Sequence, residues 1–263
     1  MRQYDLAASN IGWAAQDDET VYTLMKQLGY TALEIAPTRL FPQNPYGHLE
    51  EAADFAQNMQ QGYGLRIASL QSIWYGQAGS IFNRAQAEQL LAYTAKAFDF
   101  ARACRCKNMV FGCPRSRAIP EGRTAAEAEA FFRRVADLAM GKYVTFALEP
   151  NPPIYGTNYL NGTVETMQLV EKFRCIGIGV NLDIGAMVYN GESIGEVAPY
   201  MRFVSHIHIS EPNLAPIQPR SLHAELAALL KTVGYRNAVS VEMKCTDLDT
   251  LRRSLAYVAE VFA

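Results

Sequence analysis

Four short segments of the chain share one design, an apolar run that ends in a chemically active side chain. The segment FVSHIHISEP, residues 203–212, contains His206 and His208 two positions apart. An apolar, β-branched run that ends at a proline is typical of a buried strand where it leaves its sheet. On such a strand both histidines would point to the same face, because side chains alternate. In the other three segments the active group is a carboxylate: Glu149 in TFALEPNP, Asp183 in GIGVNLDIG and Glu242 in AVSVEMK.

One imidazole and three carboxylates at the ends of different strands are suited to a divalent metal ion. The predicted ligands are Glu149, Asp183, His208 and Glu242. This oxygen-rich set favours Mn²⁺ or Mg²⁺, and it also fits Co²⁺ or Zn²⁺. Four protein ligands leave positions for two substrate oxygens, and a metal bound to both acidifies the proton on the carbon between them. His206 lies deeper in its strand, and we expect it to serve as a core or supporting residue.

Predicted strands and helices alternate eight times along the chain. The strands are predicted at 4–13 (leading into a loop), 32–37, 65–72, 107–114, 144–150, 176–185, 203–210 and 238–244. The helices are predicted at 17–28, 48–61, 83–103, 124–140, 163–173, 195–200, 221–233 and from 247 onward. Apolar strands that alternate with helices imply a parallel sheet covered on both faces. Eight such units predict the α/β class and a single (β/α)8 TIM barrel, in one domain over residues 1–263, with its chemistry at the carboxyl ends of the strands.

An open, doubly wound sheet is the alternative architecture. It is disfavoured because no glycine-rich phosphate loop follows the first predicted strand. No linker rich in glycine, serine or proline divides the chain.

The composition narrows the class of protein. The 263 residues are 49% hydrophobic and 19% charged, with a net charge of −2, which is ordinary for a globular protein and offers no basic face for nucleic acid. No apolar run approaches the roughly 18 residues of a membrane span, and the first residues lack the apolar core of a signal peptide. Five scattered cysteines suggest reduced thiols. We therefore expect a cytoplasmic protein that acts on a small molecule, without nucleic-acid or membrane partners.

The motifs LEPNP, NLDIG, HIHISEP and VEMK, in this order and spacing, resemble the xylose-isomerase-like TIM-barrel superfamily. The most similar groups are its sugar-phosphate isomerase/epimerase-type members, which include ketose 3-epimerases, hydroxypyruvate isomerase and inosose dehydratase. The resemblance covers nearly the whole chain and is strongest from Val144 onward. It implies that the four predicted ligands hold a single metal. It also implies that Glu149 and Glu242 flank the reacting carbon, one removing a proton and the other returning one to the opposite face, and by analogy it allows a homo-oligomer.

Four positions depart from the pattern of the ketose epimerases. Ala186 stands where they have a histidine, and Leu214 stands where they have an arginine. Gly156 replaces a glutamate found in some relatives, and IQP at 217–219 replaces a Gly-x-Gly. The histidine and the arginine help to bind and polarise sugar oxygens, so their absence disfavours simple ketose 3-epimerisation and points to related chemistry on another substrate.

Other residues near the predicted mouth could bind the substrate instead. Lys244 lies two positions beyond Glu242 and could hold an anion or move a proton, or form a salt bridge at the rim. Glu211 could orient His208 or accept a sugar hydroxyl. Trp13 and Trp74 could form apolar walls against the CH face of a sugar, or pack in the core.

Two further features stay open at this stage. Glu34, inside the second predicted strand, is either the buried partner of a basic group or a pocket residue. The run Arg115–Arg117 could meet a phosphate, although a solvated loop is the better interpretation.

The leading hypothesis is a divalent-metal-dependent isomerase or epimerase of a sugar or polyol-derived ketone. A lyase or dehydratase of the same fold, acting on a keto-inositol or keto-glycoside, is the alternative, and a non-catalytic sugar-binding relative is a third. An apurinic endonuclease shares the barrel but needs more histidines than the four in this chain, and Ala186 takes one of the places where a further histidine would be expected.

Overall fold

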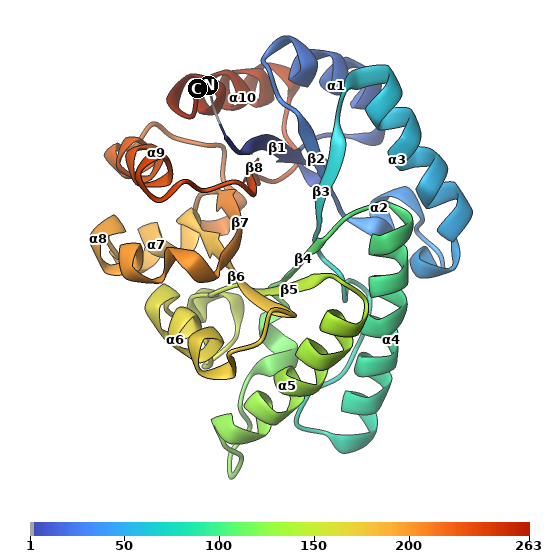
Figure 1. Ribbon diagram of the computed structural model, residues 1–263, viewed down its shortest axis with the longest axis vertical. Helices are drawn as coiled ribbons and strands as arrows, with labels where there is room; N and C mark the ends of the chain where they lie inside the picture. Colours follow the sequence, from blue (N-terminus) through green and yellow to red (C-terminus); the bar gives the residue numbers. More distant parts are fainter. Residues whose placement is uncertain (1–2) are drawn as a thin grey trace.

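The strands of the computed structural model, which describes residues 3–263, close into a parallel barrel in sequential order from β1 to β8 (Figure 1). Their bounds are β1 Asp5–Ser9, β2 Ala32–Ile35, β3 Arg66–Leu70, β4 Asn108–Phe111, β5 Thr145–Leu148, β6 Ile178–Asp183, β7 Val204–Ile209 and β8 Ala238–Val241. Each strand pairs in parallel with the next, and β8 closes the ring on β1. The predicted (β/α)8 TIM barrel is therefore confirmed.

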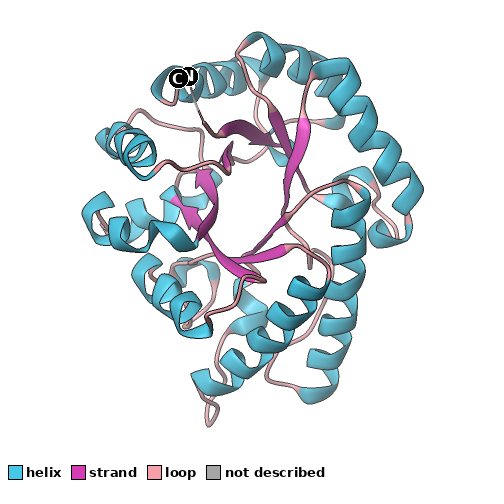
Figure 2. Ribbon diagram, in the orientation of Figure 1, coloured by secondary structure: helices cyan, strands magenta, loops and turns pink. Residues whose placement is uncertain are grey.

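Helices surround the barrel on its outside (Figure 2). They are α1 Asp18–Gln27, α2 Pro37–Leu40, α3 Leu49–Tyr63, α4 Arg84–Ala103, α5 Ala125–Gly141, α6 Thr163–Phe173, α7 Ile184–Asn190, α8 Ile194–Val197, α9 Ser221–Val233 and α10 Leu248–Val261. Within residues 3–263, none of these helices combines the length and the apolar character needed to cross a membrane. The long helices match the predicted ones to within a few residues, whereas α2 and α7 were not predicted.

Helix α7 corrects the predicted strand at 176–185, which is too long at its end. Strand β6 stops at Asp183, and the helix begins at the next residue. The side chain of Asp183 accepts a hydrogen bond from the backbone N–H of Ala186 at 2.6 Å. An aspartate in this position satisfies one of the free N–H groups of the first turn, so it starts a helix where the apolar pattern alone continues the strand.

The outward faces of the strands pack against the helices through a continuous apolar core. Aromatic rings contribute much of it: Phe111 and Phe146 stack with their centroids 4.8 Å apart, and Phe98 of α4 meets Phe146 edge-on. Burying one such ring stabilises the fold by about 1.5–3 kcal/mol. This shell fixes the strands, and thereby the height at which each strand end presents its side chain.

The inside of the barrel is unusually polar towards its mouth. Four small residues, Ala7, Ala32, Ala68 and Ala238, pack together on β1, β2, β3 and β8. Beyond them the inward positions carry fully buried polar groups, among them Glu34, Asn181, His206, His208 and Ser240. Buried polar groups must find partners inside the protein, so this interior requires a hydrogen-bonded network.

Gly177, just before β6, lies where the chain passes close to α5. A Cβ atom at this position would lie 2.1 Å from the carbonyl oxygen of Ala136 and 2.8 Å from the amide nitrogen of Met140. Both are backbone atoms of the helix, which cannot turn aside as a side chain can. The close approach of helix and strand therefore requires glycine.

We predict that Gly177→Ala lowers the free energy of unfolding by about 1–3 kcal/mol, because α5 must shift away from β6. Urea unfolding followed by circular dichroism measures this change. Gly62→Ala is the matched control, since Gly62 lies in α3 with no heavy atom within 4 Å of its added Cβ, and it should leave stability equal or slightly raised. Equal stability of the two variants would show that this contact does not constrain the start of β6.

Candidate active site

Four side chains converge at the carboxyl ends of successive strands. Glu149 follows β5, Asp183 ends β6, His208 lies in β7 and Glu242 follows β8. One ligand atom from each lies within 4.8 Å of those of the other three. Asp183 and His208 are direct partners in the strand register, which places them at the same height. The structure thus brings together the four residues predicted as metal ligands, and we call them the carboxylate–histidine cluster.

The imidazole of His208 lies between this cluster and the barrel interior. Its Nδ1 is 3.1 Å from Glu149 Oε1, 3.1 Å from Glu242 Oε2 and 3.8 Å from Asp183 Oδ2. Its Nε2 is 3.1 Å from Glu34 Oε2 on the opposite side. Burial opposes protonation of this ring, but Glu242 and Glu34 raise the pKa of His208 well above its usual range. We assign the Nε2 proton to the bond with Glu34, so a metal bound at the cluster would displace only the Nδ1 proton.

Glu34 is therefore the buried partner of a basic group, one of the two alternatives left open by the sequence. Its carboxylate also accepts a hydrogen bond from Ser240 Oγ at 2.8 Å, and His206 Nε2 lies 3.1 Å away. Burial alone would raise the pKa of Glu34, but the neighbouring His208 and His206 hold the pKa of this carboxyl well below its usual range. His206 is fully buried beside it, as expected for a supporting residue.

The two glutamates of the cluster have different surroundings. Glu149 accepts one hydrogen bond from Asn151 Nδ2 at 2.9 Å and another from Asn181 Nδ2 at 2.8 Å. Burial opposes ionisation, but His208 and these two amides lower the pKa of Glu149. Within residues 3–263 no amide donates to the Glu242 carboxylate, and burial raises the pKa of Glu242 despite the nearby His208. Glu149 is held in one orientation, whereas Glu242 is less restrained.

Burial and the crowding of like charges together explain the state of the third carboxylate. Burial, followed by the charges of Glu149 and Glu242, raises the pKa of Asp183 to about 7. Three carboxylates and one imidazole nitrogen facing a common point form a donor set suited to a hard divalent cation, whose charge would relieve this repulsion. The residues present therefore fit a single divalent metal ion.

Two more groups sit behind the cluster. Ser210 Oγ donates to Asp183 Oδ2 at 2.7 Å. Arg117 is fully buried, and its Nη2 donates to the carbonyl oxygen of Glu149 at 2.7 Å and to Asn151 Oδ1 at 2.9 Å. The interpretation of Arg115–Arg117 as a solvated loop is thus wrong for Arg117, which is buried and holds the segment after β5 through these hydrogen bonds.

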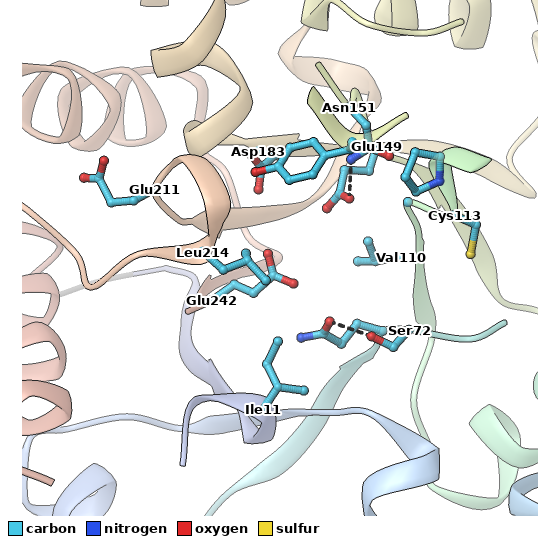
Figure 3. Close-up of a pocket in the computed structure, with 14 residues that line it drawn as sticks. Ile11, Ser72, Val110, Cys113, Glu149, Asn151, Asp183, Glu211, Leu214 and Glu242 are labelled. Atoms are coloured by element: carbon cyan, nitrogen blue, oxygen red, sulfur yellow. Dashed lines mark hydrogen bonds between the residues drawn. The ribbon is translucent and has the colours of Figure 1, made fainter. Parts of the chain in front are cut away.

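A cavity of about 210 Å³ opens directly in front of the cluster. Figure 3 shows the carboxylates of Glu149 and Glu242 facing it from two sides. Its other walls include the apolar side chains of Ile11, Val110 and Leu214. A substrate in this cavity would lie against the cluster on one side and against apolar groups on the other.

Strained backbone is found around this cavity. The lining residues Ser72, Cys113 and Leu214 have φ angles of 53°, 39° and 55°, in the left-handed region that favours glycine. Each such residue costs on the order of 1–3 kcal/mol and persists where the surrounding structure requires it, often at functional sites. A further lining residue, Tyr155, accepts a hydrogen bond from the backbone N–H of Asn213 at 2.8 Å and so joins the loops after β5 and β7.

The two tryptophans predicted as substrate walls are both buried and hydrogen-bonded. Trp13 does not line the cavity, and its indole N–H donates to Asp18 Oδ1 at 2.7 Å. Trp74 donates to Thr94 Oγ1 at 2.8 Å and packs edge-on against Phe111. It lines a neighbouring cavity and not the one at the cluster.

The two charged residues proposed for the substrate also lie apart from the cluster. Glu211 lines the cavity, but its Oε1 accepts a hydrogen bond from Arg220 Nε at 2.8 Å, and Figure 3 shows its carboxylate directed away from Glu242. Lys244 is exposed outside the cavity lining, and its backbone N–H donates to the carbonyl oxygen of Leu214.

Asn151 and Asn181 donate hydrogen bonds to Glu149 of the cluster, and neither was singled out in the sequence analysis. Asn181 lies two positions before Asp183 on β6, and Asn151 lies two positions after Glu149. Side chains two apart on a strand share a face, so this spacing could have marked Asn181 as a neighbour of Asp183. Asn151 lies beyond the end of β5, where the rule does not apply.

Comparisons with known proteins agree with this fold. No curated protein sequence matches the chain significantly. Among solved structures, a D-psicose 3-epimerase from Clostridium cellulolyticum H10, determined with D-tagatose, has a TM-score of 0.75 at 17% identity and covers 98% of both chains. A 3-keto-D-glucoside 4-epimerase from E. coli has a TM-score of 0.77 at 14% identity, and the match covers 98% of this chain and 99% of the epimerase chain. A family 2 AP endonuclease from Brucella melitensis has a TM-score of 0.74 at 19% identity, and the match covers 97% of this chain and 98% of the endonuclease chain.

These likenesses establish the architecture that the three structures share with this barrel. The family itself is established by sequence, because the model of the xylose isomerase-like TIM barrel matches residues 22–261. The chain belongs to the xylose isomerase-like TIM barrel family.

Proposed function

We propose that the protein is a divalent-metal-dependent epimerase or isomerase of a sugar or polyol-derived ketone. The observation that supports this proposal is the convergence of Glu149, Asp183, His208 and Glu242 at the cavity. Glu149 and Glu242 face the cavity from two different sides. The names of two similar structures support this choice, since one is a ketose 3-epimerase and the other a keto-glucoside 4-epimerase.

The cluster residues would hold the metal, and the same two glutamates would move protons. A bound divalent cation acts as a Lewis acid that makes the proton beside a substrate carbonyl more acidic. Glu242 and Glu149 enter from β8 and β5, so one can remove a proton from one face of the carbon while the other delivers a proton to the opposite face. Asn151 and Asn181 orient Glu149, and Glu34 orients His208.

A lyase or dehydratase acting on a keto-inositol or keto-glycoside is the second candidate. The apolar Leu214 at the cavity favours a substrate other than a simple ketose, and the same proton removal could be followed by loss of a β-substituent. Product analysis separates the two reactions. An endonuclease is disfavoured by position as well as number, since His48 is on the surface beside Glu51 and His223 bonds to Tyr257.

The first prediction concerns metal content. The purified protein should contain about one Mn, Mg, Co or Zn ion per chain, and His208→Ala should lose it because Nδ1 is removed from the cluster. Elemental analysis with and without a chelator measures this, and His48→Ala, a surface histidine, should keep the metal. A protein that holds no metal and gains no thermal stability when one is added would contradict the proposal.

The second prediction concerns Glu34. Glu34→Gln should weaken metal binding by about 10–100-fold, because the neutral amide no longer fixes the Nε2 proton of His208. Calorimetric titration of the metal-free protein with Mn²⁺ gives the affinity. Glu211→Gln is the matched control, a buried carboxylate that pairs with Arg220 outside the cluster, and it should bind Mn²⁺ as the unaltered protein does. Equal affinities for the two variants would remove Glu34 from any positioning role.

The third prediction concerns proton transfer. In deuterium oxide, the metal-loaded protein should place deuterium on the reacting carbon of its ketone substrate, which mass spectrometry of a panel of ketoses and inososes detects. Glu242→Gln should keep metal and slow this exchange by at least about 10²-fold, because the amide cannot accept the proton. Glu225→Gln, on the exposed side of α9, should exchange normally. Exchange at full rate in Glu242→Gln would rule out the two-glutamate mechanism.

A further inference from the structure

A second cavity of about 420 Å³ opens beside the one at the cluster. It is formed by the loops that follow β3 and β4. Ser72, Cys113 and Pro114 line both cavities, so the two adjoin along this shared wall. Any group attached to a molecule at the cluster could extend across this wall into the second cavity.

The size of the first cavity favours such an extension. Ligand sites usually measure about 300–1,000 Å³, and the 210 Å³ in front of the cluster is below that range. The two cavities taken together lie inside it. A ligand of ordinary size would therefore occupy both.

The residues that line the two cavities indicate where a polar part of the ligand would lie. Ile11, Val110 and Leu214 form an apolar part of the first cavity, although Gln71, Ser72 and Tyr155 also line it. A hydroxyl pressed against the apolar part would lose its bonds to water. The loop after β4 instead brings Arg115 to the second cavity. Among residues 3–263 no hydrogen-bonding or ion-pair partner of Arg115 is found, so its five N–H donors are available to ligand oxygens.

An exposed aromatic ring completes the second cavity. Tyr75 lines it and remains 71% exposed, although the neighbouring Trp74 is buried and fixed to Thr94. A tyrosine face packs well on the CH face of a sugar ring or on another flat ring, while its hydroxyl stays hydrated. An apolar face beside an unpaired guanidinium is suited to a ring that carries several hydroxyls.

We propose that the second cavity is a subsite for a neutral ring substituent, and that the substrate is a glycoside. The keto-sugar ring would lie at the carboxylate–histidine cluster, and the second ring would pack on Tyr75 with Arg115 donating to its oxygens. This inference rests on the proposed function, because it extends the substrate of that same site.

The test compares a keto-sugar with its two-ring keto-glycoside, using the metal-loaded protein. The kcat/KM for the glycoside should be at least about tenfold higher, mainly through a lower KM. Tyr75→Ala should reduce this preference about tenfold, whereas Tyr75→Phe should keep it. Tyr143→Ala is the matched control, an 82% exposed tyrosine just before β5 at the opposite end of the barrel. Equal kcat/KM for both ketones, or a preference that survives in Tyr75→Ala, would overturn the subsite.

A binding experiment keeps the two hypotheses distinguishable. If the protein turns over no ketone, the proposed function fails, and calorimetry with an unoxidised disaccharide and its monosaccharide still tests the subsite. Tighter binding of the disaccharide that is lost in Tyr75→Ala supports it, and equal binding overturns it. Tighter binding of a sugar phosphate that is lost in Arg115→Ala and kept in Tyr75→Ala would also overturn it, since the cavity would then be an anion site.

Discussion

Mutual repulsion among three carboxylates, two of them buried and the third only slightly exposed, is the constraint on which the rest of this site depends. Glu149, Asp183 and Glu242 face one another with little water to screen them, and burial together with the other two charges raises the pKa of Asp183 to about 7. Such a group is tolerable only where donors or a cation offset the charge. The protein supplies donors from behind, through amides, a hydroxyl and one imidazole, and leaves the front of the cluster open to the cavity.

His208 links this front to the interior of the barrel. Its ring is fully buried, and each nitrogen has a separate task, Nδ1 towards the cluster and Nε2 towards Glu34. Glu34 comes from β2, on the other side of the barrel, and Ser240 of β8 holds it in turn. Residues of three strands, β2, β7 and β8, therefore fix the orientation of the His208 ring. Rigid strands set such positions more exactly than loops do, which suits the single-metal site that we propose here.

Much of this could be predicted from the sequence, since the informative features were local. Apolar strands ending in Glu149, Asp183, His208 and Glu242 indicated both the barrel and the residues that meet at its mouth. Contacts across the barrel could not be predicted in this way. The hydrogen bond between Glu34 and His208 joins residues 174 positions apart, and the sequence around either residue contains no pattern that predicts the contact.

Local patterns also misled where a side chain had an unexpected partner. Arg117 belongs to a short polar run that looks solvated, yet it is buried because carbonyl and amide oxygens around Glu149 receive its guanidinium. Trp13 follows a strand, as a substrate wall would, but a hydrogen bond to Asp18 turns its indole away from the cavity. In both cases tertiary hydrogen bonds decided the side-chain position, and these depend on segments that a local reading treats separately.

Asp183 has one oxygen in the first turn of α7 and the other within reach of the cluster. The same carboxyl therefore helps to start a helix and to build the carboxylate–histidine cluster. Replacing it during evolution would disturb folding even in a descendant that no longer needs the chemistry. An aspartate at this position in a distant relative is thus weak evidence for catalysis. Glu242 is less restrained and caps no helix among the described residues, so it could change more freely and is the more informative residue to compare.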